Sequence, residues 1–528
     1  MGANGLSQGP DGDIYIAQAY GSEISALNLR DSEPGMRVVV ANDGPITSPD
    51  DVAFGAHGEV FVTEVSVGRV GVRHPDGRFG VVDDDVPAAN GIATVGSRLF
   101  VGEFREKGRI FELFPSGGPR RTVVESIDYP NGMAVDGAGQ LYFPSVLAGE
   151  IWRVGIDGGE AEKVVDGLRF PNAIKCRKDG TLLVSQATGE VLRVDPRART
   201  YTTAANLPVG NDNLLITTDG RVVVTNFLSG LVSELQADGR IDQLLAPGLI
   251  GPLGLATDTA GNVVAADVWS YVVVTPGGEL TRPAFMLTPD FPGIVRSVTI
   301  AADGTPIFAT TAGNVVRYRP RGSAEVLASG LDNVVGVCAT SEGSVMVAES
   351  GTGSLLEIGP RGQVTSVASG LQGPTGVARC SRGTVVAEST TGRVLLVEGN
   401  SRRTLGEGLQ QPHGVAVHGS WAYVVDRTGH SLHRYHLAEP RAETIATSLP
   451  TGPGREFLEK AVPGFDVAPG PWSPFAGLAV DPRGRVYLSA DGEGSILRVN
   501  PPQPGIPPPS TGGRAAGVGG RRGGGPTP

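Results

Sequence analysis

The chain is poor in the residues that build disulfide frameworks, imidazole sites and long charged helices. It has 3 cysteines and 7 histidines among 528 residues, with 6% aromatic and 19% charged residues. Cys176, Cys338 and Cys380 cannot make a disulfide framework, and their spacing matches no zinc ribbon. The sequence also contains no GxSxG elbow and no glycine-rich phosphate loop, so serine hydrolases and nucleotide-binding folds are not indicated.

Long apolar runs and a basic surface are absent as well. No run of 18 apolar residues occurs, and the N-terminus has no charged segment followed by an apolar one. We therefore expect no membrane partner and a cytoplasmic location. A formal net charge of -11 argues against nucleic acid as a partner. The oligomeric state stays open.

Glycine and proline are abundant, at 78 and 40 residues, and favour short strands joined by turns. One segment recurs: a polar residue, an apolar strand, a turn with glycine and a second apolar strand. "PNGMAVDGAGQLYFPS" and "NDNLLITTDGRVVVTN" are two copies. The copies follow one another at about 40 residues, the length of a four-stranded propeller blade. Their first residues, which we call the marker residues, are Asn4, Asp50, Asn90, Asn131, Asn172, Asp212, Leu253, Arg296, Val335, Thr375, His413 and Ala476.

Twelve copies predict an all-β protein made of twelve four-stranded blades. Propellers usually have four to eight blades, so we predict two tandem six-bladed β-propellers, residues 1–250 and 251–500. In a permuted alternative the first copy completes the second propeller, and the inner ring runs from 47 to 290. Residues 450–474 are predicted to be an insertion, either a lid or a short helix. The Pro- and Gly-rich residues 501–528 are predicted to be a disordered tail.

In the predicted blades, the start of the first strand and the end of the second meet on one rim. The first propeller presents Asn or Asp at every marker position, whereas the second does not. The predicted strand ends carry further polar groups: Gln18, Glu64, Glu103, Ser145, Gln186, Asn226, Asp267, Thr310, Glu349, Glu388 and Asp426. Carboxylate and amide oxygens suit a hard cation. The alternative for each single Asn or Asp is that it caps a turn.

"PNGMAVDGAGQLYFPSVLAGEIWRV" and "NDNLLITTDGRVVVTN" resemble repeats of the SMP-30/gluconolactonase/LRE-like family, which is similar to paraoxonases and bacterial calcium-dependent lactonases. This resemblance implies metal ligands at Asp50, Asn131, Asn172 and Asp212. Asp212 followed by Asn213 is the most specific match. Where the family has a glutamate in a Gly-Glu-x-Pro-x-Trp setting, this chain has "SPDDVAF" with Asp50 and Asp51. Because an aspartate reaches less far, the resemblance leaves three options: the ion shifts, water bridges, or Glu64 replaces it.

The function that follows is a metal-dependent hydrolase acting on a lactone or ester of a small-molecule substrate. Calcium is the expected cofactor, with magnesium, manganese or zinc as alternatives. Asp212 is expected to be both ligand and candidate base, and Glu64 or Glu103 a base or substrate contact.

Three other functions stay open. In the second propeller, "QPHGVAVHG" resembles the streptogramin lyase repeat and puts His413 on the rim near Glu349 and Glu388, while "DRTGHSLHRYHL" adds Asp426, His430, His433 and His436. An NHL-like scaffold would bind a protein partner with aromatic and arginine anchors. A strictosidine-synthase-like enzyme would use one catalytic acid and no metal.

Overall fold

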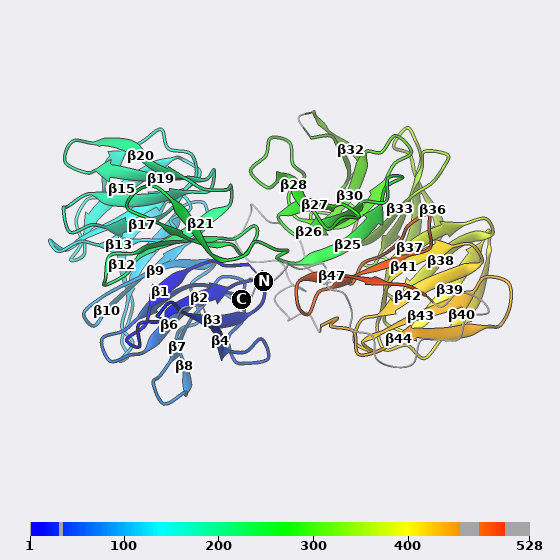
Figure 1. Ribbon diagram of the computed structural model, residues 1–528, viewed down its shortest axis with the longest axis horizontal. Coiled ribbons are helices and arrows are strands. Elements are labelled where there is room, and N and C mark those ends of the chain that lie inside the picture. Colours follow the sequence, from blue (N-terminus) through cyan, green and yellow to red (C-terminus); the bar gives the residue numbers. More distant parts are fainter. Residues whose placement is uncertain (1, 31–34, 321, 453–474, 502–528) are drawn as a thin grey trace, which may run out of the picture. The chain divides into compact units, whose positions relative to one another are not determined.

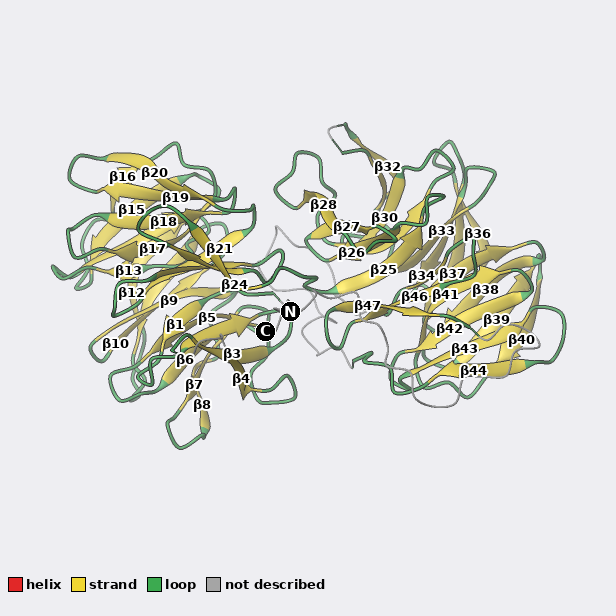
Figure 2. Cartoon of the chain, in the orientation of Figure 1, coloured by secondary structure: helices red, strands yellow, loops and turns green. Residues whose placement is uncertain are grey.

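The computed structural model describes residues 2–30, 35–320, 322–452 and 475–501. All regular secondary structure in these ranges is β-strand (Figure 1; Figure 2), which confirms the all-β class. Within them no helix is long and apolar enough to cross a membrane. Most of the expected insertion at 450–474, and all of the expected tail after residue 501, lie outside the described residues.

The chain divides after Ile250 into two compact units. Unit 1 contains six antiparallel four-stranded sheets, each made of four consecutive strands. The sheets are β1 (Leu6–Gln8), β2 (Ile14–Gln18), β3 (Glu23–Asn28) and β4 (Gly35–Val40); β5 (Pro49–Phe54), β6 (Val60–Glu64), β7 (Arg69–Arg73) and β8 (Phe79–Asp83); β9 (Ala89–Val95), β10 (Arg98–Glu103), β11 (Gly108–Leu113) and β12 (Arg121–Ile127); β13 (Ala134–Val135), β14 (Gln140–Ser145), β15 (Glu150–Gly155) and β16 (Glu162–Val165); β17 (Pro171–Cys176), β18 (Leu182–Gln186), β19 (Glu190–Asp195) and β20 (Thr200–Asn206); β21 (Asn211–Ile216), β22 (Val222–Asn226), β23 (Val232–Leu235) and β24 (Ile241–Leu245).

In unit 2 the described residues form five four-stranded sheets and one three-stranded sheet, where the sequence predicts six sheets of four strands. They are β25 (Pro252–Thr257), β26 (Val263–Asp267), β27 (Ser270–Val274) and β28 (Leu280–Phe285); β29 (Val295–Ile300), β30 (Pro306–Thr310), β31 (Val315–Tyr318) and β32 (Ala324–Ala328); β33 (Val334–Ala339), β34 (Val345–Glu349), β35 (Ser354–Ile358) and β36 (Val364–Ala368); β37 (Pro374–Cys380), β38 (Gly383–Glu388), β39 (Arg393–Glu398) and β40 (Ser401–Gly406); β41 (Pro412–His418), β42 (Trp421–Asp426), β43 (Ser431–His436) and β44 (Ala442–Ala446); and β45 (Leu478–Val480), β46 (Val486–Ala490) and β47 (Ser495–Val499).

Each repeat folds locally into a hairpin because its turn residues fit the turn. Between β13 and β14, the Gly139 N–H donates to the Asp136 carbonyl (3.1 Å), and the Asp136 carboxylate accepts the Ala138 N–H (2.9 Å). Gly139 has a φ of 76°, a left-handed conformation that glycine adopts without strain. The recurring glycine of the repeat is therefore required by the turn.

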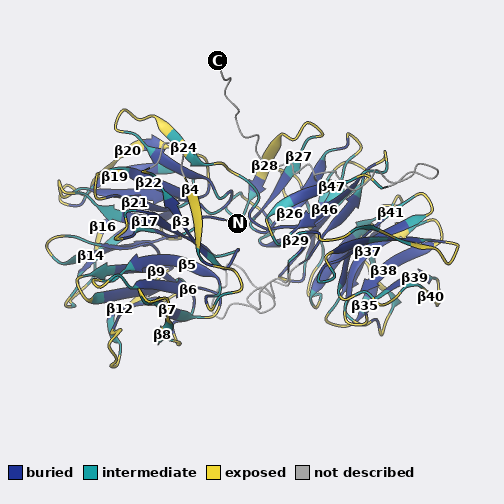
Figure 3. Ribbon diagram, turned by 60° about the horizontal axis from the view of Figure 1, so that its bottom comes forward, coloured by how far each residue is buried: buried dark blue, intermediate teal, exposed yellow. Residues whose placement is uncertain are grey.

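The apolar cores lie between neighbouring sheets. Phe61 and Val72 of one sheet share a cluster with Ile92, Leu99 and Phe111 of the next. Each large side chain buried in this way contributes roughly 1.5–3 kcal/mol, so a sheet without neighbours on both faces would lose most of its stability. Figure 3 shows the consequence: the inner strands of each sheet are buried, while an outer strand such as β4 is exposed.

The first strands of neighbouring sheets approach each other closely. The Ile174 N–H donates to the Gly132 carbonyl (3.0 Å), and a Cβ on Gly132 would lie 2.7 Å from the Ala173 Cβ. A side chain larger than hydrogen does not fit at such a contact. The glycine that follows several marker residues therefore permits this approach.

The first and last sheets of each unit are in contact. In unit 1, Leu6 and Ile14 share a core cluster with Leu215 and Val223. In unit 2, the Thr257 hydroxyl donates to the Val480 carbonyl (3.1 Å). The first sheet thus belongs to unit 1, and the permuted alternative, in which it completes the second propeller, is wrong.

Candidate functional site

Several marker residues lie in β-bulges at the start of the inner strands. Asp50 falls where the β5–β6 register shifts between Pro49 and Val52, and Asp212 where the β21–β22 register shifts between Asn211 and Leu214. A bulge inserts one extra residue into a strand and turns its side chain away from the regular alternation. The repeat therefore presents one residue per sheet outside the ladder.

Three carboxylates meet at these bulges in unit 1: Asp50, Asp51 and Asp212, which we call the carboxylate cluster. Burial raises the pKa of Asp50 well above its ordinary value, and the charges of Asp212 and Asp51 raise it further. Asp50 and Asp212 belong to the second and sixth sheets, so the fold brings together groups far apart in the sequence. The marker positions predict convergence of Asp50 and Asp212, whereas Asp51 is not a marker residue.

Asp51 has a structural role that the sequence did not show. It is 2% exposed, and its carboxylate accepts N–H groups from Val52 (2.9 Å) and from Ile92 of the next sheet (3.3 Å). A Cβ on Gly5 would lie closer than 3.0 Å to both the Asp51 carboxylate and its Cα. Asp51 thus lies against Gly5 and links the first three sheets.

Burial is the main cause of the raised pKa values in the cluster, and neighbouring carboxylates add to it at Asp50 and Asp212. Burial raises the pKa of Asp51 to about 6, although Lys175 and hydrogen bonds from Val52, Ile92 and Asn213 lower it. Burial and then the charge of Asp51 raise the pKa of Asp212 to about 7, and a hydrogen bond with Asn4 opposes that shift. Ionising all three carboxylates together is therefore unfavourable, and a bound cation would favour their ionised forms.

Lys175 is the residue that the sequence interpretation missed. It lies on β17 and feels the charge of Asp51, and burial lowers the pKa of its ammonium group. It forms no ion pair within 4.0 Å of any carboxylate in the described ranges. The signal was present: three residues after the marker, Lys175 stands where the second and fourth sheets have Ala53 and Ala134.

The asparagines of unit 1 differ in how their amides are used. Two of them accept the N–H of the residue that follows: the Asn131 Oδ1 accepts the Gly132 N–H (2.7 Å), and the Asn213 Oδ1 accepts the Leu214 N–H (2.9 Å). The Asn172 Nδ2 donates to the Asn211 carbonyl (2.9 Å), and no described residue donates to its Oδ1. Asn131 and Asn213 thus act partly as turn caps, as the alternative interpretation has it.

Asn90 has a buried amide oxygen without a donor. Its side chain is 5% exposed, and no described group donates to its Oδ1. A buried acceptor of this kind normally has a partner, whether protein, water or ion. Asn90 and Asn172 therefore supply two available oxygens on marker positions.

The side-chain oxygens at the marker positions of unit 1 are of the kind that a hard cation prefers, and only two of these side chains are carboxylates. In the described part of the chain, no three or more His, Cys, Asp and Glu side chains form a group that could hold a metal by themselves. Two carboxylates with amide oxygens would be a different kind of donor set, since calcium accepts carboxylate, amide and water oxygens together. Transition-metal sites rich in histidine or cysteine are not matched here.

The strand-end acids hold loops instead of forming a rim. Glu64 accepts the Thr47 N–H (2.7 Å) and pairs with the Arg69 Nε (2.6 Å). The same arrangement recurs in unit 2, where each carboxylate accepts an N–H from the segment that leads into its inner strand, at Asp267, Glu349, Glu388 and Asp426. Because these contacts hold the Glu64 carboxylate, we do not expect Glu64 to replace Asp50 as a ligand.

Glu103 is also ion-paired. It is 0% exposed and contacts Arg105 (2.9 Å) and Arg109 (2.8 Å). Burial raises its pKa, but hydrogen bonds from Arg109 and Arg105 outweigh burial and leave the pKa below its ordinary value. A carboxylate held by two guanidinium groups is a poor proton acceptor.

His413, the candidate of unit 2, is a buried neutral histidine. It is 3% exposed, its Nδ1 accepts the Ala476 N–H (3.3 Å), and its ring stacks on Phe475 with centroids 5.8 Å apart. Burial, followed by the charge of Arg427, lowers its pKa to about 3.

The other polar residues of that candidate have separate partners. The His433 Nε2 hydrogen-bonds to the Ser431 hydroxyl (2.8 Å), and the His436 Nδ1 accepts the Glu439 N–H (3.0 Å). His430 lies 3.5 Å from the Thr451 hydroxyl. Together with the loop-bound Glu349, Glu388 and Asp426, these contacts show several local structural roles.

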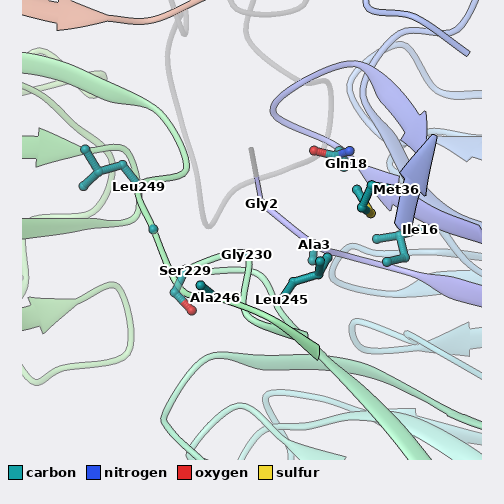
Figure 4. Close-up of a pocket in the computed structure, with 11 residues that line it drawn as sticks. Gly2, Ala3, Ile16, Gln18, Met36, Ser229, Gly230, Leu245, Ala246 and Leu249 are labelled. Atoms are coloured by element: carbon teal, nitrogen blue, oxygen red, sulfur yellow. The ribbon is translucent and has the colours of Figure 1, made fainter. Parts of the chain in front are cut away.

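A cavity in unit 1 is separate in character from the carboxylate cluster. It has a volume of about 270 Å³ and is lined by apolar residues such as Ala3, Ile16, Met36 and Leu245, with Gln18 at one side (Figure 4). No ionisable side chain is among the described residues that line it. Asn4, which follows the lining residue Ala3 in the chain, interacts with Asp212 of the cluster.

Comparison with protein-family models and with curated protein sequences finds no match. Among solved structures, the chain is similar to a streptogramin B lyase, at 16% identity and a TM-score of 0.39, over 50% of this chain and 90% of that chain. It is also similar to a chain of a nidogen/laminin complex, at 17% identity and a TM-score of 0.40, over 44% of this chain and 93% of that chain. A third is a gluconolactonase from Xanthomonas campestris, at 15% identity and a TM-score of 0.37, over 43% of this chain and 83% of that chain. At these identities and scores the matches carry no argument about chemistry.

Proposed function

We propose that each unit closes into a six-bladed β-propeller and that unit 1 is a metal-dependent hydrolase acting on a lactone or ester of a small molecule. Closure is supported by the contacts between the first and last sheets, such as the hydrogen bond from the Thr225 hydroxyl to the Asn4 carbonyl (2.5 Å). Closed rings also leave no sheet face without a partner.

The observation that supports the chemistry best is the meeting of Asp50 and Asp212 in bulged strand starts. Asp50, Asp212, Asn131 and Asn172 would hold the cation, with Asn213 and Asn90 beside them. Calcium suits this set best, because all donors are oxygens and only two are carboxylates. A bound divalent cation polarises a substrate carbonyl and stabilises negative charge on its oxygen.

The chain's own residues have three tasks in this proposal. Asp212 accepts a proton from the attacking water, while its hydrogen bond with Asn4 holds the carboxylate in place. Asp51 fixes the bulged strand starts through backbone hydrogen bonds. Glu64 and Glu103, both bound by arginines, keep loops and strands in position rather than contacting substrate.

The test is metal analysis of the purified full-length chain beside Asp212→Asn, which keeps the size of the side chain. We expect about one calcium-class ion per chain in the unaltered protein and none in the variant. A positive result leads to a screen of lactones and carboxylic esters, in which the variant is the matched control. If the unaltered chain binds no metal and no metal raises its melting temperature, the result favours a metal-independent propeller or a protein-binding scaffold.

A further inference from the structure

We infer that the side-chain oxygen of Asn90 is a further direct ligand of the cation in unit 1, beside the ligands that the family resemblance implies. This inference rests on the proposed function of unit 1. It concerns a residue that the resemblance does not name, and it can fail while the proposed metal site stands.

The Asn90 side-chain amide makes no hydrogen bond with any described residue, although Asn90 is only 5% exposed. Each of the other buried asparagines of unit 1 makes a side-chain hydrogen bond with a described residue; they are Asn131, Asn172, Asn211, Asn213 and Asn226. A buried acceptor normally has a partner. The Asn90 oxygen therefore needs a partner that no described residue supplies.

Asn90 has the same place in its sheet as Asp50 and Asp212 have in theirs. The register of β9 against β10 shifts at residues 90–91, so Asn90 lies in a bulge at the strand start. Asp50 and Asp212 lie at equivalent register shifts. Since a bulge takes its residue out of the regular pairing, the Asn90 side chain leaves its sheet at the same level as these two carboxylates.

The strand start that carries Asn90 lies between the strand starts that carry Asp51 and Asn131. On one side, the Ile92 N–H donates to the Asp51 carboxylate (3.3 Å). On the other side, a Cβ on Gly91 would lie 2.2 Å from the Asn131 carbonyl oxygen. The Asn90 segment is thus in direct contact with a segment that carries a proposed ligand on each side.

The bulge itself does not require an amide. Val335 is the marker residue of the third sheet of unit 2, lies at an equivalent register shift and is 3% exposed. An apolar side chain therefore fits this place in the fold, and folding alone does not explain the buried amide of Asn90.

The experiment is titration calorimetry of the chelator-treated full-length chain with Ca²⁺. Asn90→Val, which copies Val335, should lower the calcium affinity by about tenfold or more, because one ligand oxygen is lost. Asn90→Asp keeps an oxygen at this place and adds a charge, so it should raise the affinity by about tenfold. The matched controls Asn206→Val and Asn206→Asp make the same changes at an exposed position of β20 and should alter the affinity by less than about twofold.

Thermal unfolding in the presence of a chelator separates a ligand from a structural residue. Without calcium, Asn90→Val should keep or raise the melting temperature, since the variant removes a buried acceptor that has no donor. A purely structural asparagine would instead lose stability on replacement by valine, with or without calcium.

If the unaltered chain binds calcium and Asn90→Val keeps its affinity, or if Asn90→Asp leaves the affinity unchanged, Asn90 is not a ligand, and the metal site itself still stands. A lower melting temperature of Asn90→Val in chelator would assign Asn90 a structural role and overturn the inference as well. If the unaltered chain binds no calcium, both the metal site and this inference are overturned.

Discussion

The buried histidine of unit 2 gives a sharp prediction for stability at acidic pH. His413 is 3% exposed and its pKa is lowered from 6.5 to about 3. Because the pKa is lower in the folded state, the unfolded chain takes up the proton first as the pH falls. Stability is therefore unaffected above the unfolded pKa and is lost as the pH falls from about 6.5 toward about 3.

The size of the effect follows from the two pKa values. At pH 4.5 the unfolded chain is almost fully protonated at this position and the folded chain is not, which costs about 2.7 kcal/mol relative to pH 7. His413→Gln keeps a hydrogen-bond acceptor toward the Ala476 N–H and removes the proton-binding site. Replacing Trp152 with Phe in both proteins leaves tryptophans only beyond residue 250, so that fluorescence reports on the second half of the chain.

The assay is urea unfolding at pH 4.5, 7 and 8, with and without His413→Gln. The stability difference between the two proteins should be the same at pH 7 and pH 8, and should shift by about 2.7 kcal/mol in favour of the variant at pH 4.5. A difference that stays constant within about 0.5 kcal/mol down to pH 4.5 would refute the burial argument. Such a result would mean that His413 accepts a proton in the folded protein, as a rim histidine would.

Three further predictions test unit 1. Gly5→Ala should destabilise it by about 3 kcal/mol or more, since the new Cβ meets the Asp51 backbone, whereas Gly137→Ala, with nothing within 4 Å, should change the melting temperature little. Glu103→Gln should cost about 2–4 kcal/mol in urea unfolding because two arginines lose their carboxylate, yet calorimetry should show unchanged calcium binding; a loss of binding would return Glu103 to the site. Asp212→Asn should raise the melting temperature in the presence of a chelator by a few degrees, because one crowded charge is removed, and should abolish the further rise on adding calcium. A lower melting temperature in chelator would show that charge crowding does not destabilise the empty cluster.

The repeat made the strands predictable, because every hairpin contains its own turn chemistry. The aligned glycine, as at Gly139, fixes the turn, and the alternating apolar residues fix the buried face of each strand. Each sheet was therefore predictable from its own stretch of sequence. The same repeat predicts that Asp50 and Asp212 converge, because both occupy the marker position of their repeat. The sequence left the permuted boundary open because repeats that share one pattern do not specify which copy contacts which.

The roles of the polar residues were less predictable because they depend on contacts between sheets. In the sequence both Glu64, at a strand end, and Asp212, at a strand start, are acids of the predicted rim. In the structure an arginine five residues later pairs with Glu64, whereas only Asn4 opposes the raised pKa of Asp212. Asp51 could not be interpreted without seeing that it lies against Gly5. Lys175 was visible as an exception within an aligned apolar position, and alignment of all copies at that column would have found it.

The bulges at the start of inner strands such as β5 and β21 separate two requirements that usually compete. The marker residue stands outside the regular pairing, so its side chain can change without altering the hydrogen bonds that hold the sheet. The same bulge occurs at Arg296 and at His413 in unit 2, with quite different side chains. These positions thus accept different side chains while the sheets around them keep the same pairing. We therefore expect that substitutions at the marker residues of unit 2 alone can introduce new functional groups there.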